Sequence, residues 1–264
     1  MSPILLDPGA LALAALLVLA NAAASLALRL GLGRKLVTAG ARAVIQLLLL
    51  GYVLVLVFES DSPWIVIGLM LAMAFVAGVE AVRRTTRRVP GIYKSSLGVV
   101  MVSSMAITFY ALFVILRVEP WYAPQYAIPI LGMVLGNTLN GISLGLETVM
   151  AGFDEKRAEI ELLLAHGATR REASREVVRR AVRTGLIPTL NMMVAAGTVS
   201  IPGMMTGQIL AGEDPMNAAR YQIFILFCIA GGVAIGTVGV VFAVARLVFD
   251  DRDRLRTDRI RHLR

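Results

Sequence analysis

Residues 221–245 read YQIFILFCIAGGVAIGTVGVVFAVA, a run of 25 residues without a charge between Arg220 and Arg246. An α-helix needs roughly 20 apolar residues to cross the hydrocarbon core of a bilayer, so this run is long enough for one transmembrane helix. The rest of the chain has the same character, because 57% of its 264 residues are apolar and the mean hydropathy is +0.74. Soluble domains are about 45–50% apolar. The composition therefore predicts an all-α polytopic membrane protein.

The uncharged windows give the expected number of spans. The window 43–58 reaches bilayer length only if the long side chain of Arg42 extends from its end toward the headgroups. We predict about seven transmembrane helices in a single transmembrane domain over residues 1–264, with a cytoplasmic helix pair between the fifth and sixth helices. Besides 221–245, the windows are 8–28, 43–58, 62–79, 95–116, 120–146 and 184–212.

The basic residues predict the orientation. Lys and Arg number 26, and all but Arg117 and Arg220 fall after the first, third, fifth and seventh windows. Because Lys and Arg concentrate on the cytoplasmic side, we expect a multi-pass protein of the cell inner membrane with its N-terminus outside and its C-terminus in the cytoplasm. Residues 250–264 would then be a basic cytoplasmic tail. The basic residues lie between apolar runs, so we expect lipid and not nucleic acid as their partner.

Residues 150–183 form the one long segment between windows. We expect a helix from Asp154 to Ala165 that ends at Gly167, which suits a left-handed C′ position. Thr169 with Glu172 three residues later is a capping box and predicts a second helix. This helix is basic and amphipathic, and such helices also bind anionic lipid at a membrane surface.

Three strings in the sequence carry a resemblance to a known family. ELLLAHGAT at 161–169 looks like the coupling segment of ABC-transporter permeases, where a helix, a glycine turn and a second helix dock on an ATPase subunit. SIPGMMTGQILAG at 200–212 and IPILGMVLGN at 128–137 are more specific. Together with RAVIQL at 42–47 and Gly51-Tyr52, they resemble the FetB-type permease family, whose bacterial members are implicated in iron export and whose plant members are implicated in aluminium tolerance. The resemblance covers about residues 40–230.

The resemblance implies a permease subunit of an ATP-driven exporter, most simply of iron or a related metal, which forms a homodimer and binds a separate ABC ATPase. The sequence has no G-x-x-x-x-G-K-[ST] phosphate loop, so we expect ATP and Mg on the partner subunit and no cofactor on this chain. We expect no catalytic residue here and no enzymatic activity of the chain by itself. The residues implied in ATPase coupling are Glu161, His166, Gly167, Ala168 and Thr169.

Polar and helix-breaking residues inside the windows are candidates for the transport pathway or gate. Amides in hydrocarbon must find partners inside the bundle, so Asn137, Asn140 and Asn191 are either structural hydrogen bonders or pathway residues. Proline removes a backbone donor, so we expect the sixth helix to be broken or kinked within the string Ser200, Ile201, Pro202, Gly203 and Met204. Broken helices line ion sites in transporters, and the alternative is a packing kink.

Two further groups have a structural and a functional interpretation. The pairs Gly132/Gly136 and Gly141/Gly145 allow close helix approach, either within the chain or at a permease–permease or gate interface. Two carboxylates near the cytoplasmic helix ends, Glu80 and Glu147, could attract a hard cation that prefers oxygen ligands. Glu80 could equally pair with Arg83 or Arg84. The metal ligands are otherwise unknown from the sequence.

A secondary transporter or channel without an ATPase is the alternative function. An ion-coupled carrier would more readily place paired carboxylates at mid-membrane, and the windows contain none. An intramembrane enzyme is disfavoured because the sequence has two histidines, one cysteine and no cluster of His, Asp and Glu. The same count excludes a disulfide scaffold and leaves little for a histidine-built metal site.

Overall fold

The computed structural model describes residues 7–60, 62–250 and 252–262, and these residues form nine α-helices. Their contacts divide the chain into two compact units. Among the described residues, one unit covers 7–60 and 210–212, and the other covers 62–209, 213–250 and 252–262. The all-α prediction is confirmed. The single domain over 1–264 stays a prediction.

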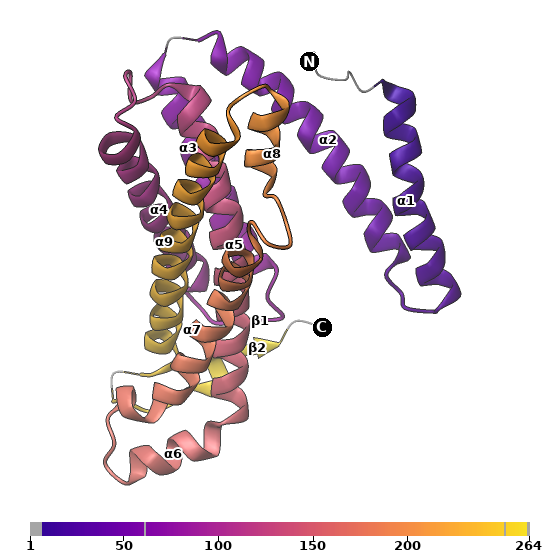
Figure 1. Ribbon diagram of the computed structural model, residues 1–264. Coiled ribbons are helices and arrows are strands. Elements are labelled where there is room, and N and C mark those ends of the chain that lie inside the picture. The colour runs from indigo at the N-terminus through magenta and orange to yellow at the C-terminus, as the bar shows by residue number, and fades with distance from the viewer. Residues whose placement is uncertain (1–6, 61, 251, 263–264) are drawn as a thin grey trace. The chain divides into compact units, whose positions relative to one another are not determined.

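The first unit is a pair of antiparallel helices, α1 (Pro8–Ala27) and α2 (Gly33–Phe58) (Figure 1). Asp7 begins α1, since its carboxylate accepts a hydrogen bond from the Ala10 backbone N–H at 2.8 Å. In the connection, the Ser25 hydroxyl accepts from the Leu32 N–H at 3.0 Å. A Cβ added at Gly33 would lie 3.1 Å from the Ala22 carbonyl oxygen, so glycine allows the two helices to meet closely.

The second unit packs around the long helix α5, which contacts α3, α4, α7 and α9. Figure 1 shows α3, α4, α5 and α9 running alongside one another, with α6 at the end of the bundle. A two-stranded antiparallel sheet joins β1 to β2 near the chain end. The elements are α3 (Pro63–Arg83), β1 (Arg87–Arg88), α4 (Ile92–Phe109), the π-helix η1 (Tyr110–Leu116), α5 (Pro124–Glu155), α6 (Arg157–Ala165), α7 (Arg170–Ala195), α8 (Gly203–Leu210), α9 (Pro215–Val248), the 3-10 helix η2 (Thr257–Arg259) and β2 (Arg261–His262).

Glycines allow close packing where α5 meets α7 and α9. A Cβ at Gly141 would lie 2.6 Å from Val233 Cγ1 and 3.0 Å from the Gly185 carbonyl oxygen. A Cβ at Gly145 would lie 3.1 Å from Thr237 Cγ2. These two glycines therefore allow close helix packing within the chain, which is one of the two interpretations given from the sequence.

The other glycine pair of α5 has more room. A Cβ at Gly132 would lie 3.5 Å from Met73 Cε, which is ordinary contact, and nothing lies within 4 Å of one at Gly136. Gly132 and Gly136 face a shallow groove between α3 and α5 that Met73 and Ala77 also line.

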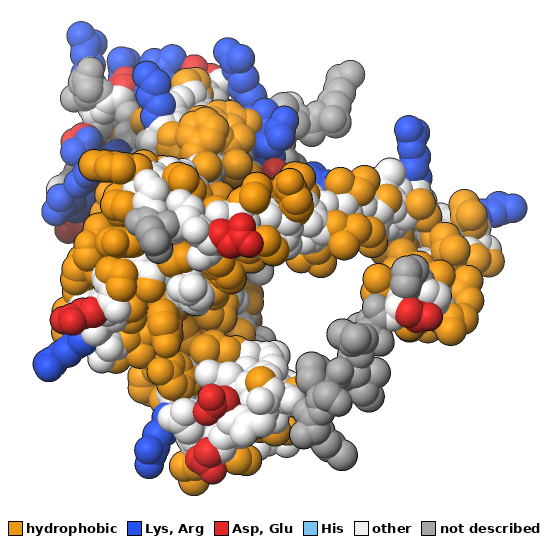
Figure 2. All heavy atoms as spheres, turned by 90° about the horizontal axis from the view of Figure 1, so that it is seen from above, with side chains coloured by type: hydrophobic (Ala, Val, Ile, Leu, Met, Phe, Trp, Pro, Cys, Tyr) orange, Lys and Arg blue, Asp and Glu red, His pale blue; other side chains and the backbone are white. Residues whose placement is uncertain are grey.

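Much of the surface is apolar, as expected for a protein that faces lipid. The space-filling view shows apolar side chains over the sides of the helices and groups of Lys and Arg apart from them (Figure 2). Leu47 and Leu48 on α2 are each 68% exposed, and so is Val102 on α4. Exposed apolar surface of this extent marks a membrane or protein contact.

Six helical stretches among the described residues are long and apolar enough to cross a membrane: α1 from Gly9, α2, α3, α4 with η1, α5 and α9. The seven-helix count is not confirmed. Window 184–212 is not one helix, because α7 ends at Ala195 and α8 begins only at Gly203. With eight residues, α8 is about 12 Å long, far short of the bilayer core.

Candidate functional site

The turn between α6 and α7 has the geometry of a Schellman motif. Gly167 adopts the left-handed conformation with φ +87°. The Ala168 N–H donates to the Leu163 carbonyl at 3.1 Å, and the Gly167 N–H donates to the Leu164 carbonyl at 3.0 Å. These bonds satisfy the last carbonyls of α6, so the helix stops at His166. The turn predicted at Gly167 is therefore present, although α6 begins at Arg157 and not at Asp154, which still belongs to α5.

A capping box starts α7 directly after this turn, as predicted. The Glu172 N–H donates to the Thr169 hydroxyl at 3.3 Å, and the Thr169 N–H donates to the Glu172 carboxylate at 2.8 Å. The bond from the backbone N–H, together with one from the Thr169 hydroxyl, lowers the pKa of the Glu172 carboxyl below its ordinary value. The direction of α7 relative to the turn is thus held by reciprocal bonds at its first residues.

Side chains on both sides of the turn hold α6 against the bundle. Ile160 is buried, with 1% of its surface exposed. Lys156, between α5 and α6, donates to Glu176 of α7 at 2.7 Å, and this hydrogen bond raises the pKa of the Lys156 ammonium. Arg157 donates to Glu161 at 2.8 Å along α6. An ion pair therefore links the α5–α6 connection to α7, and the buried Ile160 packs α6 against the bundle.

The surface of the turn combines apolar and polar groups open to a partner. Leu162 and Leu163 are 59% and 40% exposed. His166 is exposed, and its Nδ1 lies 2.8 Å from the Leu162 carbonyl oxygen. We call residues 161–169 the turn surface. Beside it, a cleft of about 600 Å³ lies between α6 and the chain end, lined by Glu161, Leu164, Ala168 and residues 252–256.

The chain end lies closer to this surface than the sequence indicated. Arg170 is 3.3 Å from Asp253, and His262 Nε2 is 3.1 Å from Asp154 at the end of α5. Arg87 of β1 pairs with His262 of β2. The sequence predicted no contact between the basic tail and the rest of the chain, because pairing between residues so distant in sequence leaves no local pattern.

Helix α7 runs without interruption from the turn surface into window 184–212. Its 26 residues correspond to about 39 Å at 1.5 Å per residue. It packs closely on α5, since a Cβ at Gly152 would lie 2.7 Å from Val177 Cγ1 and one at Gly185 would lie 2.7 Å from the Gly141 carbonyl oxygen. One continuous helix, with Pro188 in its second half, therefore connects the turn surface with the break that follows Ala195.

The break between α7 and α8 covers residues 196–202, longer than the proline string alone indicated. Gly197 is left-handed at φ +80°, and its N–H donates to the Ser200 carbonyl at 2.9 Å. The Ser200 N–H donates to the Ala195 carbonyl at 3.1 Å. Pro202 stands directly before α8, so it begins the second half-helix and the break already starts six residues upstream. Gly203 and Met204 belong to the first turn of α8.

The asparagines predicted as pathway residues differ in their surroundings. Asn137 is half-buried and donates to the Met133 carbonyl one turn earlier at 2.8 Å. Asn140 is exposed and accepts from Arg84 at 2.9 Å. Asn191 is exposed near the end of α7. The three side chains do not form one cluster.

Glu147 and Glu80, the two carboxylates predicted near helix ends, contact residues at the end of α3 and in the connection from α3 to α4. Glu147 accepts from the Thr86 N–H at 2.8 Å and from the Arg87 guanidinium at 2.8 Å. Glu80 lies 3.8 Å from Arg84, the pairing that the sequence offered as its alternative to cation binding. Among the described residues, no group of three or more His, Cys, Asp and Glu could hold a metal ion. A metal site is therefore not assigned.

The fold and the turn surface define a helical multi-pass membrane protein with a structured segment outside its spans. A family model described as "Uncharacterised protein family (UPF0014)" matches residues 8–249, and the chain belongs to this family. No solved structure matches it.

Three relatives match this chain over most of their own length. A UPF0014 membrane protein of Synechocystis is 41% identical, covering 86% of this chain and 87% of its own. The "Probable iron export permease protein FetB" of Escherichia coli is 30% identical over 93% of both chains. The "Protein ALUMINUM SENSITIVE 3" of Arabidopsis thaliana is 33% identical over 79% of this chain and 75% of its own. The resemblance seen in the sequence strings is confirmed.

Proposed function

We propose that this chain is the permease subunit of an ATP-driven exporter, and that a separate ATPase subunit docks on the turn surface. The observation that carries the proposal is the continuity of α7. Its first residues are held by the capping box at the turn surface, and its last residue precedes the break. Movement of a docked ATPase would therefore reach the break through one helix.

The proposed substrate is iron or a related metal cation. The support is the printed names of two relatives, one of which refers to iron export and the other to aluminium. Both metals as trivalent ions are hard cations that prefer oxygen ligands. The break exposes backbone within a membrane window, where irregular backbone of transporters lines cavities and coordinates ions.

The proposed orientation places the turn surface in the cytoplasm, where ATP is available. The distribution of Lys and Arg supports this assignment, with the N-terminus outside the inner membrane and the C-terminus in the cytoplasm. Termini on opposite sides require an odd number of crossings, so α7, the break and α8 together would make one crossing beside the six long helices. We further propose that the permease forms a homodimer through the open face of α5 around Gly136, where small residues permit close helix approach.

Two measurements test the proposal. The first is co-purification of the chain with candidate ATPase subunits, followed by metal-dependent ATPase and transport assays in liposomes. A complex whose ATP hydrolysis rises with iron supports the proposal, whereas metal transport by the chain alone, driven by an ion gradient, supports a secondary transporter.

The second measurement is cysteine labelling. Cysteines introduced at Arg84 to Arg88 and near Arg261 should react with impermeant thiol reagents only from the cytoplasm. Labelling from outside would contradict the orientation and with it an ATPase site at the turn surface.

A further inference from the structure

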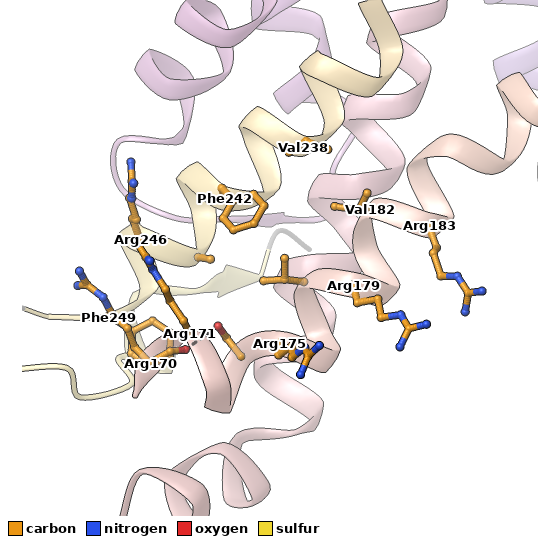
Figure 3. Close-up of a pocket in the computed structure, with 13 residues that line it drawn as sticks. Arg170, Arg171, Arg175, Arg179, Val182, Arg183, Val238, Phe242, Arg246 and Phe249 are labelled. Carbon is orange, nitrogen blue, oxygen red and sulfur yellow. Dashed lines mark hydrogen bonds between the residues drawn. The ribbon is translucent and has the colours of Figure 1, made fainter. Parts of the chain in front are cut away.

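A groove with apolar walls and a basic rim lies between α7 and α9, apart from the turn surface and the break. Its volume is about 730 Å³. Val182 of α7 and Val238 and Phe242 of α9 lie around its apolar part, and the labelled arginines surround them (Figure 3). We call it the arginine groove. Its arginines are Arg170, Arg171, Arg175, Arg179 and Arg183 of α7 and Arg246 of α9.

The positive charge of the arginine groove is largely uncompensated. Arg170 pairs with Asp253 at 3.3 Å. The other five arginines have no ion-pair partner within the part of the chain that the structure describes. Like charges on one helix face repel one another, so an anion from outside the chain would relieve this repulsion.

The groove lies at the depth where lipid tails meet headgroups. The uncharged run of α9 ends at Ala245, and Arg246 follows it. Val238 stands eight residues before Arg246, about 12 Å along the helix axis. Phe242 between them is 50% exposed. The apolar part of the groove therefore faces the hydrocarbon and the guanidinium groups reach the headgroup layer.

We infer that the arginine groove binds an anionic phospholipid, with its phosphate among the guanidinium groups and an acyl chain on Val182, Val238 and Phe242. Guanidinium groups bind phosphate oxygens in a bidentate manner. Basic pockets between membrane helices at the cytoplasmic side suit such headgroups. A soluble phosphate would leave the apolar wall uncovered, and a zwitterionic lipid would leave the positive charge uncompensated.

The test titrates the purified full chain in detergent with phosphatidylglycerol or phosphatidylcholine and counts bound lipid by native mass spectrometry. Arg175→Gln with Arg246→Gln removes one charge from each wall. Arg34→Gln with Arg180→Gln removes the same charge from residues outside the groove. An arginine near anionic lipid contributes enough for about a fivefold change in affinity, so the groove pair should bind phosphatidylglycerol roughly 25-fold more weakly.

Further variants separate the parts of the proposal. Arg175→Lys with Arg246→Lys keeps both charges and should bind phosphatidylglycerol almost as well as the unmodified chain does. The melting temperature of the Arg175→Gln, Arg246→Gln variant in detergent shows whether that variant is folded. Phe242→Ser should weaken the binding of phosphatidylglycerol and leave the direct binding of inorganic phosphate unchanged.

Three results would overturn the proposal. Equal weakening in the Arg34 and Arg180 control would indicate general surface attraction. Binding of phosphatidylcholine as tight as that of phosphatidylglycerol would show that the headgroup charge is not recognised. Displacement of phosphatidylglycerol by inorganic phosphate at similar concentration would identify a site for a soluble anion.

Discussion

Replacement of Gly167 by valine isolates the backbone geometry of the turn surface. The glycine has φ +87°, and a Cβ placed there would meet nothing within 4 Å. The Cβ of a valine would therefore meet no distant group, and the cost of the substitution comes mainly from the left-handed conformation. That cost is about 1–2 kcal/mol, which lowers the ratio of formed to unformed turn about 5- to 30-fold. If an ATPase subunit docks here, its binding should weaken in proportion to the fraction of turn that becomes unformed, at most by this factor.

Two controls accompany Gly167→Val. Asparagine tolerates the left-handed region, so Gly167→Asn should keep most of the binding. Gly98→Val makes the same chemical change on α4, where the surroundings are also open and φ is not positive. The assay measures ATPase subunit retained per permease in liposomes and metal transport per assembled complex, with protein level followed in the same membranes.

Full binding and transport in Gly167→Val would refute the reasoning, because the turn would then not need its observed geometry for docking. An equal loss in Gly167→Asn would also refute it, since any side chain would then be harmful and the backbone conformation would not be the cause.

Three further predictions concern packing, the break and pH. Gly185→Ala places a Cβ 2.5 Å from a Thr side chain of α9 and should lower stability by about 1–3 kcal/mol. Gly68→Ala on α3, where a Cβ has open space, should not lower stability. Melting in detergent compares the two variants, and equal stability contradicts the packing. Pro202→Ala alone should leave the break in place, because left-handed Gly197 already ends the helix upstream. Metal transport per assembled complex should therefore be unchanged. A loss of transport would show that the proline has a direct role. The pKa of Glu172 is lowered by the folded capping box, so its contribution is present above the unfolded pKa and is lost as pH falls through the folded value. Protection from hydrogen exchange at the start of α7, measured relative to the intrinsic exchange rate at each pH, should therefore fall in that acidic range. The fall should be smaller in Glu172→Gln, which has no charge to lose, and an equal fall would contradict the role of the carboxylate.

Local signals in the sequence predicted most of the helical segments. The capping box at Thr169 and the turn at Gly167 depend on residues three or four positions apart, so their pattern is visible in the sequence. The helix ends near them were less accurate: Lys156 separates α5 from α6, although no glycine or proline marks that point. Charge-free windows located the long helices, because burial in lipid selects against charge along the whole span.

Contacts between segments far apart in the chain could not be predicted from the sequence. Asn140 receives its hydrogen bond from Arg84, 56 positions away, and Glu147 holds Thr86. Nothing in the local pattern distinguishes such partners from pathway residues. The sixth window failed as a single span for a related reason: hydropathy measures composition, and it does not register that Gly197 turns the backbone into the left-handed region.

The length of α5 sets how far the turn surface stands from the lipid. Its 32 residues correspond to about 48 Å, and the hydrocarbon core is about 30 Å thick, so an untilted α5 would extend beyond it by about 18 Å in total at its two ends. A docked subunit would consequently be held at a fixed height above the headgroups. Thicker bilayers reduce that height unless the helix changes its tilt. Acyl-chain length is thus expected to alter the efficiency of coupling without any change in the protein.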